Sequence, residues 1–319
     1  MTHRFGWYAR PGALIVALSL LGILLGGCTP TATNHALVRV QKPVTRVKVA
    51  AAHAIRDIDN ITFGHAAGVP LLLDLCLPAQ APTPGYVRRP VVILVHGGSW
   101  AHGDKSEWSG ICHWLASDGF VAASIGYRLA PEYVFPAGIN DVETAVRWLK
   151  NPSQVAAYSI NPDRIGAFGG SAGGNLVSLL GVSGIGAPGQ GDRVQAVVEL
   201  SAPIDLTSAG LEQPDFYPLE LSYLGCSSYA TCPQATAASP IFHVASTDPP
   251  FFIAQSTNEF IPLVQSQRFV AALRAKHVPT TFRTRPGDRH SVEMLDPLLK
   301  QDILHFLHST LGDPSVATR

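Results

Sequence analysis

The feature that most constrains this chain is a regular alternation of two kinds of segment. Short apolar runs rich in β-branched residues alternate with helical stretches from residue 69 to residue 311. Such alternation is typical of βαβ units, in which helices cover both faces of a mostly parallel sheet. Residues 91–95 (VVILV) form a continuous apolar run, as expected of a central strand buried on both faces. We therefore expect an α/β domain with a mostly parallel central sheet.

The expected elements follow from the periodicity of the apolar residues. Strands are expected at 71–77, 91–95, 120–125, 164–168, 194–200, 251–254 and 280–284, and helices at 108–117, 140–149, 175–180, 264–276 and 292–311. Residues 206–240 break this rhythm, because they hold several Pro, Phe and Tyr residues with little periodicity. We interpret 206–240 as a small lid insertion and 49–319 as one catalytic domain, since no linker interrupts it.

The N-terminus has the pattern of an export signal. Arg4 and Arg10 precede an apolar run at 13–25, which is too short and wrongly flanked for a membrane span. The run ends in Leu-Gly-Gly followed by Cys28, which resembles a bacterial lipobox. We expect residues 1–27 to be a lipoprotein signal peptide, Cys28 to be lipidated and 28–48 to be a tether. A plain signal peptide or an uncleaved anchor is the alternative. The lipoprotein interpretation places the domain outside the cytoplasm, on the outer face of the cell membrane.

The remaining cysteines and the charge exclude other classes of protein. An extracytoplasmic location permits disulfides, and we expect one between Cys226 and Cys232, which lie in a loop-like segment. Cys76 falls in a strand and Cys112 in a helix, where we expect small buried hydrophobic residues. No cysteine pair has zinc-ligand spacing, so no metal or cofactor is expected. The net charge is zero and 14% of residues are charged, which gives no basic field for nucleic acid.

The sequence Gly-Gly-Ser-Ala-Gly at 169–173 carries the first chemical signal. It follows an expected strand and opens an expected helix, which is the context that makes the G-x-S-x-G pattern informative. Ser171 would then lie on a sharp turn that exposes its hydroxyl. Side chains at positions 169 and 173 would clash in that turn, which explains the glycines. The pattern predicts Ser171 as a nucleophile.

Two further segments complete the expected machinery. His-Gly-Gly-Ser-Trp at 96–100 follows the strand 91–95, and its small residues allow backbone N–H groups to point into an oxyanion hole. We expect His96 to brace this loop and not to act as a base. His290 follows the last expected strand, as the serine–acid–histidine order of such enzymes requires. It is therefore the expected general base.

Together these motifs resemble the α/β-hydrolase esterases of the hormone-sensitive-lipase-like and BD-FAE-like families. The resemblance covers residues 69–311 and also includes Tyr-Arg-Leu-Ala-Pro-Glu at 127–132, to which we assign an architectural role. It implies an α/β-hydrolase fold and oxyanion donors at Gly98, Ser99 and Ala172. The family loop has a glycine where this chain has Ser99, which keeps the backbone N–H.

The triad acid departs from the family pattern. The family resembles G-x-x-D-x-x-V-P, with Asp four residues before Pro, whereas this chain has Asn258 at that position. Glu259, one residue later, is the acid we favour. Asp205, after the strand 194–200, and Asn258 as a surrogate are the alternatives. A carboxylate matters here, since an amide at this position costs about 10⁴ in rate in the trypsin example.

The leading functional hypothesis is hydrolysis of a small-molecule carboxylic ester through an acyl-enzyme, without a cofactor. A related hypothesis keeps the mechanism and cleaves an aryl formamide, because His-Gly-Gly-x-Trp also resembles kynurenine-formamidase-like enzymes. A third hypothesis is a degenerate hydrolase fold that serves as an envelope binding protein, for which Asn258 is the argument. The oligomeric state and the acyl chain length of the substrate do not follow from the sequence.

Overall fold

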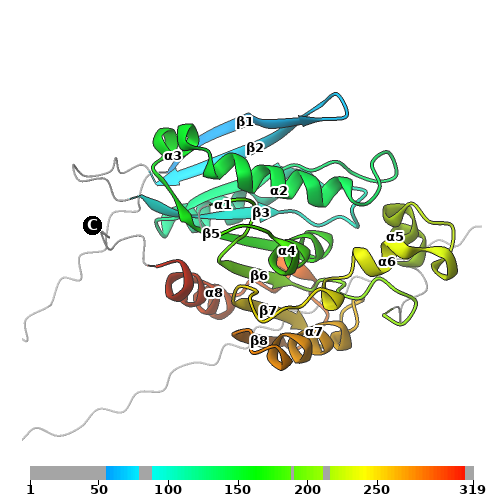
Figure 1. Ribbon diagram of the computed structural model, residues 1–319. Helices are drawn as coiled ribbons and strands as arrows, with labels where there is room; N and C mark the ends of the chain where they lie inside the picture. Colours follow the sequence, from blue (N-terminus) through cyan, green and yellow to red (C-terminus); the bar gives the residue numbers. More distant parts are fainter. Residues whose placement is uncertain (1–54, 79–87, 188–189, 211–215, 313–319) are drawn as a thin grey trace, which may run out of the picture. The chain divides into compact units, whose positions relative to one another are not determined.

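A computed structural model describes residues 55–78, 88–187, 190–210 and 216–312. Within these residues eight strands form one sheet in the order β1-β2-β4-β3-β5-β6-β7-β8 (Figure 1). β2 pairs antiparallel with β1 and β4, and the neighbours from β4 to β8 are parallel. The strands are β1 (Ile55–Ala66), β2 (Val69–Pro78), β3 (Arg89–Val95), β4 (Val121–Ile125), β5 (Ile160–Gly170), β6 (Ala196–Leu200), β7 (Phe251–Ser256) and β8 (Thr280–Arg285).

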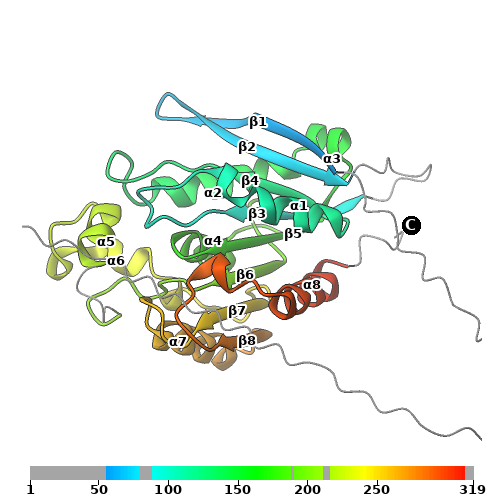
Figure 2. The same cartoon turned by 180° about the vertical axis from the view of Figure 1, so that it is seen from behind.

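Helices cover both faces of the sheet. The first face carries α2 (Ala137–Lys150), α3 (Pro152–Tyr158), α4 (Ala172–Ser183) and α7 (Leu263–Ala275), which share one buried apolar cluster (Figure 1). The opposite face carries α1 (Ser109–Ser117) and α8 (Pro297–Leu311), which pack in a second cluster (Figure 2). The central strand β3 shows why both faces are covered. Val91, Ile93 and Val95 point into the first cluster, and Val92 and Leu94 into the second.

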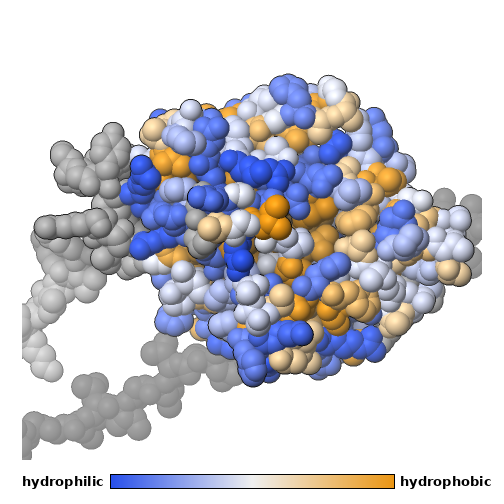
Figure 3. All heavy atoms as spheres, viewed as in Figure 1, coloured by the Kyte–Doolittle hydropathy of each residue, from blue (hydrophilic) through white to orange (hydrophobic). Residues whose placement is uncertain are grey.

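Apart from the 3-10 turns η1 (Lys105–Trp108) and η5 (Ser291–Met294), the remaining elements of the described residues lie between β6 and β7. They are α5 (Tyr217–Leu224), η3 (Tyr229–Thr231), α6 (Pro233–Ala237) and η4 (Pro240–Phe242). The first three fall within the segment 206–240 and η4 begins at its last residue, and α5 and α6 lie at the end of the sheet where the parallel strands finish (Figure 1). On the face seen in Figure 3, apolar side chains gather beside these elements, whereas α2 presents mostly polar atoms.

The architecture confirms the predicted fold class. Each expected strand is present, but β1 and α3 were not predicted. β1 alternates exposed and half-buried residues over most of its length, so its sequence has little of the apolar signal that marks the inner strands. The prediction of a single helix at 292–311 was wrong: a 3-10 turn, η5 (Ser291–Met294), comes first, and α8 begins at Pro297. Asp296 caps α8 by accepting the N–H of Leu299.

Both cysteine pairs of this domain are bonded. The expected Cys226–Cys232 bridge is present. Cys76 and Cys112 are buried, as expected, but they also form a disulfide. This bridge joins β2 to α1. It could not be inferred from spacing, because the two cysteines are 36 residues apart and belong to different elements.

Several predictions fall outside the described residues. They are the signal peptide at 1–27, the lipidation site Cys28 and the tether at 28–48. None of the helices in the described ranges is long and apolar enough to cross a membrane.

Candidate active site

Ser171 lies between β5 and α4 with a backbone φ of 56°, a conformation that L-residues rarely adopt. The surrounding backbone leaves no room for side chains. A Cβ atom added to Gly169 would overlap the carbonyl of Gly173, and one added to Gly173 would overlap the carbonyl of Val95. The N–H of Ser171 donates to the carbonyl of Leu200 at 2.8 Å. Overlap with backbone carbonyl groups therefore accounts for both glycines of the motif.

The loop that follows β3 lies against Ser171. A Cβ atom at Gly97 would lie 3.1 Å from Cβ of Ser171. The next three residues have positive φ: 108° at Gly98, 53° at Ser99 and 57° at Trp100. Such a tight turn directs successive N–H groups into a concave surface that suits an anion. Gly98 and Ser99 thus lie in a turn next to Ser171, and Ala172 follows it directly in the chain.

His96 is part of the support of this loop. Its ring stacks on Tyr127 at a centroid distance of 4.4 Å, and its Nδ1 lies 2.8 Å from the carbonyl of Gly97. Burial lowers the pKa of His96, so the ring stays neutral at physiological pH. The hydroxyl of Tyr127 donates to the carbonyl of His96 at 3.0 Å. These contacts match the bracing role expected for His96.

The segment 127–132 holds the loop of residues 96–100 in place. Arg128 binds the buried carboxylate of Asp141 with several hydrogen bonds, the shortest of which is 2.7 Å. The N–H of Ala130 donates to the carbonyl of Trp100 at 2.8 Å. The segment therefore joins α2 to residues 96–100, the expected oxyanion loop, as an architectural element would.

Glu259 and His290 are bonded to each other. Nδ1 of His290 is hydrogen-bonded to Oε2 of Glu259, whose side chain is fully buried. The other imidazole nitrogen, Nε2, is buried and has no hydrogen-bond partner within the described ranges of the chain. Gly170, which precedes Ser171, lies against Ser291, which follows His290, because a Cβ at Gly170 would overlap Oγ of Ser291. His290 is thus oriented by a carboxylate, and its second nitrogen has no partner among the described residues. The loop of His290 lies next to the turn between β5 and α4 that carries Ser171, called the elbow below.

The two alternative acids lie elsewhere. Asp205 accepts hydrogen bonds from the N–H and the hydroxyl of Thr207, at 3.0 and 2.6 Å. Asn258 is exposed, and its backbone N–H donates to the carbonyl of Gly287. Of the three candidates, Glu259 is the one whose carboxylate bonds His290.

Two residues near the triad were not singled out from the sequence. Ser201, which is fully buried, donates its hydroxyl to Oε1 of Glu259 at 2.6 Å. Glu199 on β6 is also fully buried, and burial raises its pKa to about 8, with a smaller contribution from the charge of Glu259. The signal that could have found Glu199 is a carboxylate inside an otherwise apolar strand.

Aromatic rings extend from the oxyanion loop to the histidine. Trp100 stacks on Tyr223 of α5 at 4.3 Å, and Phe216 lies 6.1 Å from Trp100 and 6.0 Å from Phe260. The ring of Phe260 is 4.3 Å from that of His290 and is 46% exposed. Phe216 and Tyr223, from the segment 206–240, therefore contribute to an apolar wall beside the candidate triad.

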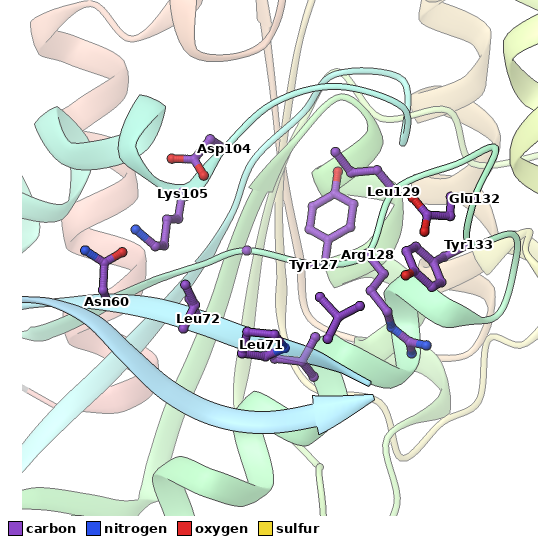
Figure 4. A pocket seen from close by; sticks show the side chains of 13 residues that line it. Asn60, Leu71, Leu72, Asp104, Lys105, Tyr127, Arg128, Leu129, Glu132 and Tyr133 are labelled. Atoms are coloured by element: carbon purple, nitrogen blue, oxygen red, sulfur yellow. The ribbon is translucent and has the colours of Figure 1, made fainter. Parts of the chain in front are cut away.

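A separate pocket of about 350 Å³ lies at the same edge of the sheet (Figure 4). The start of β2, the residues after β4 and Lys105 line it, and Tyr127 separates it from His96. Its cations are already paired: Lys105 binds Asp74 at 2.9 Å, and Arg128 binds Asp141. Neither Ser171 nor His290 lines this pocket, so it is not part of the candidate triad site.

One group of side chains within the described segments has the spacing of metal ligands. It consists of Asp57, Cys76 and His113. The sulfur of Cys76 is bonded to Cys112 and is not a thiolate, while His113 and Asp57 are paired at 3.0 Å. The group therefore lacks the thiolate that would make it a metal site.

The sheet order, the strand–elbow–helix turn and the histidine after the last strand define an α/β-hydrolase. The family model BD-FAE matches residues 73–273, and the chain belongs to this family. Solved structures share the fold. A truncated carbohydrate esterase from gut microbiota has 22% sequence identity and a TM-score of 0.69, and the match covers 81% of this chain and 97% of that one. An esterase from Thermogutta terrifontis has 22% identity and a TM-score of 0.65, with coverage of 84% and 95%.

Curated relatives are named as esterases. Esterase LipQ of Mycobacterium tuberculosis is 30% identical over 235 residues, which are 70% of this chain and 55% of LipQ. The carboxylic ester hydrolase LipM of the same organism is 30% identical over 217 residues, which are 65% of this chain and 50% of LipM. The chain thus spans about half the length of these relatives.

Proposed function

We propose that this protein is a serine hydrolase that cleaves carboxylic esters through an acyl-enzyme intermediate. The observation that carries the proposal is the pairing of Glu259 with Nδ1 of His290, which leaves Nε2 without a partner in the described part of the chain. The loop of His290 approaches the strained turn of Ser171, because Ser291 lies against Gly170. A carboxylate that orients an imidazole next to a serine is the arrangement that activates a hydroxyl as a nucleophile. The names of the relatives and neighbours support an ester as the substrate.

In the proposed reaction, Nε2 of His290 accepts the proton of Ser171 while Oγ attacks the ester carbonyl. Glu259 stabilises the imidazolium that forms, and the same proton then passes to the departing alcohol. The backbone N–H groups of Gly98, Ser99 and Ala172 stabilise the oxyanion. A water molecule, activated by His290, releases the acid from the acyl-enzyme in the second half of the reaction. No step requires a metal or a cofactor.

Nε2 of His290 has no hydrogen-bond partner within the described residues, so the bond to Oγ of Ser171 that this mechanism uses would form when substrate binds. Catalytic hydrogen bonds are often long in ligand-free structures and tighten when substrate binds. The close approach of Ser291 to Gly170 brings the loop of His290 against the turn of Ser171, which supports this pairing.

The test uses p-nitrophenyl acetate and butyrate with the wild-type protein and with Ser171→Ala. We expect ester hydrolysis by the wild type and loss of at least about 10³ in kcat in the variant. A fluorophosphonate probe should label the wild type and leave Ser171→Ala unlabelled. Folded wild type that neither hydrolyses the esters nor reacts with the probe would instead fit a binding protein. Faster cleavage of an aryl formamide than of either ester would point to the formamidase alternative.

We further propose that the protein is a lipoprotein anchored through Cys28 outside the cytoplasm. The support is the Leu-Gly-Gly-Cys sequence that ends the apolar run at 13–25. Two bonded cysteine pairs in the domain agree with an oxidising location. Cys28→Ser should move the protein from the membrane fraction to the soluble fraction of the envelope, and mass spectrometry of the wild type should show acyl chains on Cys28. A wild-type protein without acyl chains contradicts this proposal.

A further inference from the structure

The last residue of β6 and the residue after it bind Ser171, Glu259 and the neighbour of His290. The carbonyl of Leu200 accepts the N–H of Ser171 at 2.8 Å. The hydroxyl of Ser201 donates to Oε1 of Glu259 at 2.6 Å and accepts the N–H of Ser291, the residue after His290, at 3.0 Å. Nucleophile, acid and histidine come from three loops that are far apart in the sequence, and these two residues connect them.

Ser201 is held firmly in this position. It is fully buried, its φ is 55°, and its N–H donates to the carbonyl of Ala254 at 3.0 Å. On the other side, Oε1 of Glu199 accepts the N–H of Ala202. The Ser201 oxygen accepts the N–H of Ser291. Its hydroxyl has two acceptors within reach, Oε1 of Glu259 at 2.6 Å and the sulfur of Met294 at 4.0 Å, and the carboxylate is the nearer and the stronger acceptor.

The acid needs such a contact more than an aspartate would. A glutamate side chain has one more rotatable bond than an aspartate, and Glu259 is displaced by one residue from the position where the family pattern has Asp. Both hydrogen bonds that hold it, from Ser201 Oγ at 2.6 Å and from the N–H of Ser256 at 3.2 Å, go to Oε1. Oε2 is thereby left for His290.

We infer that Ser201 is a positioning residue for the triad: its hydroxyl selects the Glu259 conformation that presents Oε2 to His290 and ties that conformation to the histidine loop. This inference rests on the proposed serine-hydrolase function. Ser201 touches neither the substrate nor the nucleophile, so its effect on rate passes through Glu259.

The first test is Ser201→Ala, assayed on p-nitrophenyl butyrate. A hydrogen bond to a buried charged group is lost, so kcat should fall about 10- to 100-fold, with KM changed less than about two-fold. The matched control is Ser124→Ala. Ser124 is equally buried and its hydroxyl donates to the carbonyl of Lys105 at 2.7 Å, but it has no contact with Glu259 or His290. Its kcat should stay within about two-fold of wild type.

The decisive test is a double-mutant cycle with Glu259→Gln. If Ser201 acts through the acid, Ser201→Ala should lower kcat by less than about two-fold once Glu259 is replaced. A merely structural role would lower kcat by the same factor in both backgrounds. Ser201→Cys, which keeps a weak donor at the same position, should fall between Ser201→Ala and wild type, and it serves if the alanine variant does not fold.

The outcomes separate the two proposals. Wild type that hydrolyses the ester together with Ser201→Ala that keeps more than half of the wild-type kcat overturns the positioning role, and so does an additive cycle. Wild type and Ser124→Ala that both fail to hydrolyse any ester overturn the proposed function.

Discussion

The two halves of the candidate site are built in different ways. The nucleophile side is fixed by backbone geometry: Ser171 lies on a turn where Gly169 and Gly173 contact carbonyl groups that leave no space for a side chain. The acid side is fixed by side-chain hydrogen bonds, in which Ser201 and the N–H of Ser256 bind one oxygen of Glu259 and His290 binds the other. Steric exclusion of side chains thus fixes the position of Ser171, whereas hydrogen bonds fix the position of Glu259.

This difference explains why one half follows the family pattern and the other departs from it. A turn that excludes Cβ atoms admits few sequences, so the G-x-S-x-G pattern is maintained. A carboxylate held by hydroxyl and N–H donors can come from a neighbouring position, provided that it reaches the same atoms. Glu259 does so, although Asn258 occupies the family position of the acid.

The largest effect should come from removing the acid. Glu259→Gln keeps the shape of the side chain but cannot stabilise the imidazolium, so kcat should fall by about 10³ to 10⁴. Asp205→Asn is the control, because Asp205 binds Thr207 and not His290. Its kcat on the same p-nitrophenyl ester should change less than about three-fold. Similar losses of kcat in both variants would show that the hydrogen bond to His290 does not identify Glu259 as the triad acid.

The nucleophile side should be almost as sensitive, but for a steric reason. A Cβ at Gly173 would overlap the carbonyl of Val95, and a displacement of about 1 Å can cost about 10² in rate. We expect Gly173→Ala to lose at least that much kcat and to unfold at a lower temperature.

Gly110 of α1 provides the matched control for this substitution. A Cβ there meets nothing within 4 Å, so Gly110→Ala should keep full activity and gain about 0.5–1 kcal/mol in the free energy of unfolding. Full activity of Gly173→Ala in a p-nitrophenyl butyrate assay would refute the steric account of the elbow.

A change in the support of the oxyanion loop should have an intermediate effect on kcat. Tyr127→Phe removes the hydroxyl that donates to the carbonyl of His96 and keeps the ring that stacks on it. The loss of one buried hydrogen bond should cost about 1–3 kcal/mol of stability. We expect kcat to fall about ten-fold, as measured by steady-state kinetics, with denaturant unfolding as the stability assay. An unchanged kcat would mean that the loop does not need this support.

The smallest effect should be a pH dependence of stability at Glu199. Burial raises its pKa to about 8 in the folded protein, above its ordinary value, and the charge of Glu259 acts in the same direction. Between pH ~4.5 and ~8 the unfolded chain therefore releases a proton that the folded protein keeps, and the free energy of unfolding falls as pH rises.

Glu199→Gln removes this pH-dependent loss. The stability of the variant relative to wild type should therefore increase from pH 4.5 to pH 8, by at most a few kcal/mol. Thermal unfolding at the two pH values measures the difference. A constant difference would show that Glu199 ionises normally in the folded protein.

Much of the fold could be predicted because its core strands are buried on both faces. Strand β3 is apolar at every position from Val91 to Val95, and this pattern survives in any single sequence. β1 was missed for the opposite reason, since it lies at the edge of the sheet and buries few side chains. The disulfide between Cys76 and Cys112 depends on the tertiary packing of β2 on α1, which spacing does not encode.

The site was predictable where a local pattern dictates geometry. Ser171 and the His96 loop each follow a strand directly, so their positions at the sheet edge follow from the order of elements. The contact between Ser201 and Glu259 joins residues 58 positions apart, and its only trace in the sequence is a serine after a strand. The choice among Glu259, Asn258 and Asp205 therefore required coordinates.

The two bridges have a practical consequence for anyone who produces this protein. Closing a longer loop restricts the denatured chain more, so the Cys76–Cys112 bond, which spans 36 residues, should contribute about 4 kcal/mol and the six-residue Cys226–Cys232 loop about 2 kcal/mol. A recombinant host whose interior keeps thiols reduced would deliver material lacking both cross-links, with β2 no longer covalently joined to α1. Such a preparation could be inactive for reasons unrelated to its catalytic groups, so expression in an oxidising compartment should precede any judgement of activity.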